Sequence, residues 1–144
     1  MSYSSQALRA RFTDGALSTA SGPRVVVMAY DRLDRDLAGA IAALEMKDIT
    51  TSHQLLVHAQ DLVHELLFML DLDVWEHAST LAAIYRYVSD LLTKANVTKS
   101  AGAAVEARRL LAELGDAFRQ AATQVGQATV WAEGAEQRHV SVRA

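Results

Sequence analysis

The chain has 144 residues, with 14 basic and 17 acidic side chains, 51% hydrophobic residues and no cysteine, and this length suits one domain. The lack of cysteine excludes disulfides, a cysteine-ligated zinc finger and a thiol nucleophile, and a formal charge of −3 gives no reason to expect nucleic-acid binding. No run approaches the roughly 18 apolar residues of a membrane span and the N-terminus lacks an apolar signal stretch, so we expect a soluble, cytoplasmic protein without membrane insertion.

Helix-forming residues dominate the chain, which holds one proline and seven glycines, and the sequence predicts an all-α fold. Residues 1–20 form an N-terminal segment ahead of the first helix, which begins at Ser21 and ends before a turn at 46–48. The second helix begins between Asp48 and Ser52, where Asp and Thr offer N-caps. Its two adjacent apolar stripes form a wider arc than a two-helix contact needs, so part of this face is free to bind a partner.

Apolar residues at three- and four-residue spacing predict a third helix over 74–96, with Asn96 as its stop, and a fourth over 101–125. Gly39 and Gly115 lie inside predicted helices, where we expect close approaches between neighbours. Four helices joined by short turns predict an antiparallel four-helix bundle over 21–125, followed by a flexible C-terminal tail at 126–144.

The sequence offers only weak candidates for catalytic or metal-binding residues. Glu-x-x-His occurs once, at 136–139 in the polar tail, whereas a di-iron bundle needs that motif on two helices and a glutamate on each of two others. His58, Asp61 and Glu65 share one helical face, for which a solvated polar face is a better interpretation than a divalent cation site. No nucleophile triad or phosphate-binding loop can be placed. We expect no enzyme, no catalytic residues, no metal and no other cofactor.

The aromatic residues allow two interpretations. Tyr30, Tyr85 and Tyr87 lie in the middle of predicted helices, and composition alone favours tyrosines that fill the core with their hydroxyls at its edge. The alternative is an apolar groove that accepts a partner helix, with Phe12 and Leu17 of the N-terminal segment covering it when it is empty.

Several motifs occur in a fixed order along the chain. Phe12 and Leu17 precede Thr-Ala-Ser at 19–21 and an apolar run, VVVMAYD, at 25–31. AQDLVHEL at 59–66 precedes Leu-Asp at 70–71, and LAAIYRY at 81–87 precedes Ala-Asn at 95–96. In this order, over roughly residues 12–122, they resemble the flagellar secretion chaperone family, FliS. The chain departs from the family pattern in having Phe12 for Tyr, Ala29 for Leu and Phe118 for Trp, and it lacks the Gly-Gly turn before the third helix.

The resemblance implies a cytoplasmic export chaperone. Such a protein binds the disordered C-terminal segment of flagellin, prevents its premature polymerisation and keeps it competent for flagellar type III secretion, with the flagellar export gate as a further partner. No nucleotide or metal is implied. Periodicity then suggests a partner-binding groove formed by Tyr30, Leu56, Val63, Leu67, Ile84, Tyr87 and Leu91, with Phe12 and Leu17 as its intramolecular cap.

A competing class is a helical adaptor or self-associating structural bundle that binds a different amphipathic partner. Spare apolar surface would then let the protein form a homodimer with two-fold symmetry. A small metal-dependent enzyme is a third class, and it predicts bound metal in the purified protein.

Overall fold

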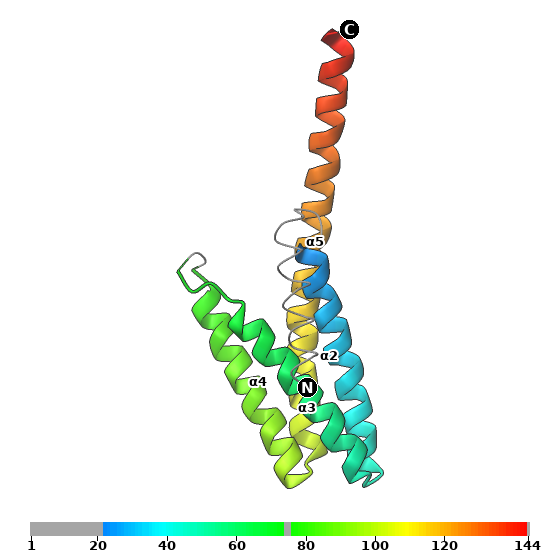
Figure 1. Ribbon diagram of the computed structural model, residues 1–144, viewed down its shortest axis with the longest axis vertical. Helices are drawn as coiled ribbons and strands as arrows, with labels where there is room; N and C mark the ends of the chain where they lie inside the picture. Colours follow the sequence, from blue (N-terminus) through cyan, green and yellow to red (C-terminus); the bar gives the residue numbers. More distant parts are fainter. Residues whose placement is uncertain (1–21, 74–75, 144) are drawn as a thin grey trace.

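The computed structural model describes the backbone of residues 22–73 and 76–143, and the side chains of this part up to residue 124 (Figure 1). The described chain forms four helices: α2 (Gly22–Glu45), α3 (Ile49–Phe68), α4 (Ala78–Thr98) and α5 (Ala101–Arg143). Neighbouring helices pack antiparallel, which confirms the predicted all-α bundle. The expected start at Ser21 and the N-terminal segment, with Phe12 and Leu17, lie outside the described residues.

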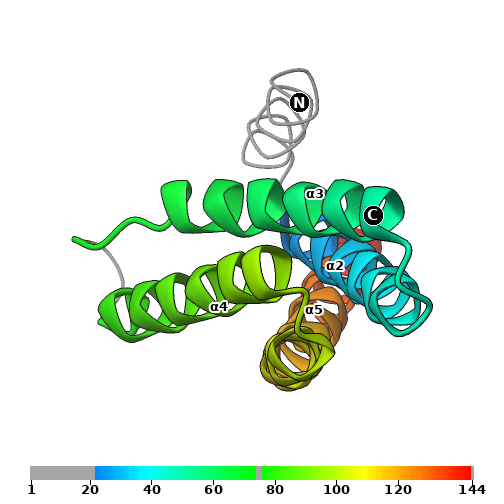
Figure 2. The ribbon, with the colours of Figure 1, turned by 90° about the horizontal axis from the view of Figure 1, so that it is seen from below.

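The four helices form a closed ring of contacts, in which α2 packs against α3 and α5, and α4 packs against the same two helices. Figure 2, seen from below, shows α2 and α5 nearly end-on, with α3 and α4 running away to one side. In Figure 1 the α3–α4 hairpin leans away from α2 and α5, and the two pairs converge at the end where the α2–α3 and α4–α5 turns lie. This tilt opens the bundle at its other end.

The turn between α2 and α3 lies at 46–48, as predicted. Lys47 takes a positive φ of 59°, and the backbone amide of Asp48 donates to the carbonyl of Ala43 at 2.8 Å. The Asp48 side chain then caps α3 by accepting from the backbone amide of Thr51 at 3.1 Å. The predicted start of the second helix is therefore confirmed, and the sequence signal was the Asp that precedes Ile-Thr-Thr.

The end of α4 differs from the expected stop at Asn96. The helix continues to Thr98, and Lys99 takes the left-handed conformation, with φ 52° and ψ 43°. Asn96 lies within the helix, with its Nδ2 3.0 Å from Nδ1 of His53 and its Oδ1 accepting from Lys99 Nζ at 2.7 Å. The start of α4 at Ala78 is also later than the expected residue 74, and residues 74 and 75 lie outside the described part.

The last helix is longer than the predicted 101–125. α5 continues without a break past residue 125 to Arg143, and in Figure 1 it extends well beyond the other three helices. The chain has no proline after Pro23, and alanine and glutamine recur after residue 120. Glycine at 126 and at 134 costs about 1 kcal/mol each relative to alanine, which lowers the stability of a helix without terminating it.

The core runs along the bundle axis, and two glycines mark where helices approach closely, as expected. A Cβ on Gly39 would lie 2.8 Å from Cδ1 of Leu55, so α2 and α3 meet there at short range. A Cβ on Gly115 would lie 3.4 Å from Cβ of Tyr30, where α5 passes α2. In the part of the chain that the structure describes, no helix is both long and apolar enough to cross a bilayer.

Candidate partner-binding groove

An open apolar groove of about 470 Å³ lies between α4 and α5. One face of each helix supplies its lining, because the contributing positions recur at three- and four-residue spacing. From α4 come Thr80, Ala83, Ile84 and Tyr87, and from α5 come Glu106, Leu110, Glu113 and Leu114. Ile84, Leu110 and Leu114 are partly buried, since their inner sides pack on the core and their outer sides form the floor of the groove.

Tyr87 reaches across the groove from the α4 wall to the α5 wall. Its ring is 48% exposed, and its hydroxyl reaches from α4 to α5, donating to Oε1 of Glu106 at 2.6 Å. This hydrogen bond to a carboxylate raises the pKa of Tyr87 above its ordinary value. The hydrogen bond restrains the half-exposed Tyr87 ring, so the side chain loses little conformational entropy when a partner binds. A restrained aromatic ring that offers apolar area in this way suits a contact residue.

The seven residues expected to form one groove do not share one surface. Tyr30, Leu56, Val63 and Leu91 are all buried in the core, so the expectation of an accessible groove is corrected for these four. Tyr30 on α2 and Leu91 on α4 belong to the hydrophobic core. Leu56 and Val63 are buried because their helix, α3, is covered by α2 on one side and by α4 on the other. Both of its apolar stripes are therefore needed inside the bundle.

The three remaining residues keep some access to solvent. Leu67 is partly buried on α3, packed against the core and away from the α4–α5 groove. Ile84 and Tyr87 do come together, as predicted from their spacing on one helical face. The α5 side of the groove was missed, because the expected groove drew on residues of α2, α3 and α4 alone. The sequence carries no signal for this wall, because how far Leu110 and Leu114 stay uncovered depends on the packing of the helices around them.

Tyr30 and Tyr85 fill the core as expected, but their hydroxyls lie inside it and not at its edge. Their hydroxyls are 2.5 Å apart and buried, and the Tyr30 ring stacks on Phe118 with centroids 5.3 Å apart. Burial raises the pKa of Tyr85 to about 12 and that of Tyr30 still further, so both stay protonated in any physiological setting. This contact supports the walls of the groove and offers no acid–base chemistry.

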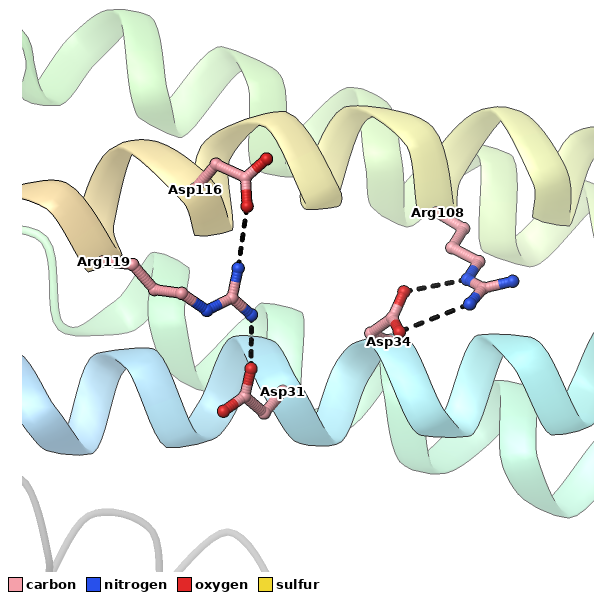
Figure 3. A network of polar contacts seen from close by, with 5 residues as sticks. All are labelled: Asp31, Asp34, Arg108, Asp116 and Arg119. Carbon is pink, nitrogen blue, oxygen red and sulfur yellow. Dashed lines mark hydrogen bonds and ion pairs between the residues drawn. The ribbon is translucent and has the colours of Figure 1, made fainter.

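Charged side chains join α5 to α2 on the face away from α4 (Figure 3). Arg108 forms a bidentate pair with Asp34, in which Nε donates to Oδ1 at 2.8 Å and Nη2 donates to Oδ2 at 3.3 Å. Arg119 donates to Asp31 on α2 and, at 2.8 Å, to Asp116 on its own helix. The hydrogen bonds from Arg108 hold the pKa of Asp34 below its ordinary value. These pairs fix how α5 lies along α2, and so hold one wall of the groove in place.

The helical face that carries His58, Asp61 and Glu65 is used for packing. His58 Nδ1 contacts Oδ2 of Asp36, a carboxylate that is only 3% exposed and that also accepts from Arg32 Nε at 3.2 Å. Within the described residues no group of three or more histidine, cysteine, aspartate or glutamate side chains is placed to hold a metal ion. On this face it is His58 that joins α3 to α2.

The structure defines an all-α four-helix bundle with an apolar groove between α4 and α5 and charged pairs that join α5 to α2. The protein family described as flagellar protein FliS matches this chain over residues 4–125. A relative, the flagellar secretion chaperone FliS of Bacillus subtilis (strain 168), is 26% identical over 110 residues, which cover 76% of this chain and 82% of that protein. The chain therefore belongs to the FliS family of flagellar secretion chaperones, as its motifs indicated, and it is a chaperone rather than an enzyme.

Proposed function

We propose that this protein is a cytoplasmic export chaperone for flagellin. It binds the C-terminal segment of flagellin, which is disordered in the free monomer, as a helix whose apolar face lies in the α4–α5 groove. The family supports the general role, and the open apolar groove with its half-exposed Tyr87 is the observation that carries the binding site. Apolar grooves between helices commonly accept amphipathic helices in this way.

The dimensions of the groove suit such a ligand. Its lining spans residues 80–87 of α4 and 106–114 of α5, or about two helical turns on each wall. A segment that folds on binding loses conformational entropy at that moment, which limits affinity for a given buried area. Moderate affinity suits a cargo that must be released at the export gate. An apolar face held in this groove is also withheld from other flagellin molecules, which blocks premature polymerisation.

The binding test is calorimetry of the purified protein with the isolated C-terminal segment of a flagellin from the same genome. We expect roughly one-to-one binding, a negative heat-capacity change and an increase in helical circular dichroism. Absence of binding at high micromolar concentration would contradict the proposal. The self-associating bundle would instead be supported if the purified protein is a dimer, if substitutions in the groove dissociate that dimer, and if flagellin does not bind.

Variants locate the site. Tyr87→Ala removes the exposed ring and should weaken flagellin binding about tenfold or more, because central aromatic contacts commonly carry 1–2 kcal/mol or more of binding energy. Val97→Asp is a matched control on α4, since Val97 is 76% exposed and does not line the groove, and it should bind as the parent protein does. Unchanged binding by Tyr87→Ala would place the site elsewhere. Val63→Asp is unsuitable for this purpose because its buried position makes unfolding the expected result.

A further inference from the structure

The polar lining of the α4–α5 groove carries charge of one sign. None of the eight lining residues is basic, and two of them, Glu106 and Glu113, are carboxylates on the α5 wall. They lie seven residues apart, so they stand on the same face of α5 at a separation of about 10.5 Å along the helix axis. Apolar residues of both walls lie next to them. The groove therefore combines an apolar floor with an acidic rim.

Both carboxylates keep the capacity to bind a cation. Glu106 accepts a hydrogen bond from Tyr87, whose neutral hydroxyl does not cancel the negative charge, and Arg109, whose charge acts at Tyr87, lies three residues further along α5. Glu113 lies 3.4 Å from Arg109 one turn earlier, but these side chains are 67% and 62% exposed. Exposed pairs of this kind are weak, and weaker when the basic residue precedes the acidic one along the helix. A ligand cation can therefore compete for Glu113 at little cost.

We propose that this groove selects an amphipathic helix bearing two basic side chains two turns apart at the edge of its apolar face, paired with Glu106 and Glu113. The inference rests on the proposed function, in that the same groove holds the cargo segment, and it adds the chemistry by which cargo is recognised. A helix lying along α5 has its own positions i and i+7 on one face at the same spacing as the two glutamates. Acidic residues at those two positions would meet like charges.

The expected size of the preference follows from the exposure of the rim. Each exposed ion pair contributes about a twofold to fivefold gain in affinity, so two pairs give about fourfold to twenty-fivefold. Because these charges are in contact with solvent, salt near 0.5 M should remove most of the preference, whereas the apolar contribution should remain. Measuring affinity over a range of salt concentrations therefore separates the contribution of the ion pairs from that of the apolar contacts.

The experiment uses the full-length protein and three designed peptides of about 18 residues, long enough to form a helix on binding. They share one stripe of leucine and alanine and differ only at two edge positions seven apart, which carry lysine, glutamine or glutamate. Binding is measured by fluorescence anisotropy at about 0.05 M and about 0.5 M salt. We expect the lysine peptide to bind best and the glutamate peptide worst at low salt, with the three values converging at high salt.

Protein variants assign the effect to the rim. The double variant Glu106→Gln with Glu113→Gln keeps an acceptor for the Tyr87 hydroxyl and should bind all three peptides about equally. Glu45→Gln, an exposed glutamate at the end of α2, is the matched control and should keep the full preference. The inference is overturned by equal binding of the three peptides to the parent protein, by failure of all of them to bind, or by a preference that survives in the double variant.

The outcome with flagellin separates this inference from the proposed function. If the flagellin segment binds but the designed peptides show no charge preference, the chaperone function stands and the acidic rim has no role in selection. If the lysine peptide binds through Glu106 and Glu113 while the flagellin segment does not bind, the groove recognises basic amphipathic helices and its partner is another protein.

Discussion

The hydroxyls of Tyr30 and Tyr85 meet at 2.5 Å in the core and join α2 to α4, two helices that are diagonal in the bundle and share no close backbone contact. Within the described part of the chain, the helix pairs whose backbones come close are all neighbours around the ring. This hydrogen bond therefore ties the hairpin containing α4 to the pair formed by α2 and α5, across the core behind the groove. Each hydroxyl has the other as its partner in a buried setting, so neither can be lost without consequence.

Removing one of these hydroxyls should destabilise the protein. Tyr85→Phe leaves the Tyr30 hydroxyl buried without its partner, and we expect the free energy of unfolding in urea to fall by about 1–3 kcal/mol. The double variant Tyr30→Phe with Tyr85→Phe removes both polar groups, so its cost should be clearly less than the sum of the two single costs. Tyr87→Phe, at an exposed hydroxyl, is the control and should change stability by less than about 0.5 kcal/mol. Additive costs for the two buried sites would contradict the pairing.

The same pair predicts loss of stability at alkaline pH. Burial raises the pKa of Tyr85 to about 12, and that of Tyr30 further, from the ordinary value of 10.0. Above pH 10 the unfolded chain releases these protons while the folded protein retains them, so the free energy of unfolding falls as pH rises. Between about pH 9 and about pH 11 the parent protein should lose about 1–3 kcal/mol more than the double phenylalanine variant. Urea unfolding at each pH gives these losses. If the free energy of unfolding falls equally in the two proteins, the tyrosine pair makes no contribution.

Sequence patterns predicted the helices better than the surfaces between them. The Asp48 cap and the turn before it are local features, and local features are readable from neighbouring residues. The burial of Val63 is different, because periodicity identifies an apolar stripe but not whether one neighbouring helix or two will cover it. The α4–α5 groove depends on the tilt of the α3–α4 hairpin, a property of the whole bundle that leaves no trace in the spacing of Glu106 or Leu110.

The two glycines at close helix contacts should respond differently to alanine. At Gly115 an added Cβ would sit 3.4 Å from Cβ of Tyr30, an ordinary contact distance, so Gly115→Ala should gain about 0.5–1 kcal/mol of stability from helix propensity. At Gly39 the Cβ would lie 2.8 Å from Leu55 Cδ1, and the leucine must move away. Gly39→Ala should therefore gain less than Gly115→Ala or lose stability, as measured by thermal and urea unfolding. The reverse order would show that α5 packs on Tyr30 more tightly than α3 packs on α2.

Two aspartates of α2 with similar ionic partners should differ in what they contribute. Asp36 is 3% exposed and holds both His58 and Arg32, whereas Asp34 is 46% exposed and pairs with Arg108 at the surface. Asp36→Ala removes buried hydrogen bonds to charged or polar partners and should cost about 1.5–3 kcal/mol in urea unfolding. Asp34→Ala should cost no more than about 1 kcal/mol, because water and salt screen an exposed pair.

Salt and acid provide the controls for this comparison. The small effect of Asp34→Ala should shrink further in about 0.5 M salt, while that of Asp36→Ala should persist. The pKa of Asp34 is lowered in the folded protein, so its contribution is present above the ordinary value of 3.8 and is lost as pH falls below it. The parent protein and Asp34→Ala should therefore converge in stability at acid pH. Equal costs for the two aspartates at neutral pH would mean that the buried carboxylate stabilises the α2–α3 contact no more than a surface pair does.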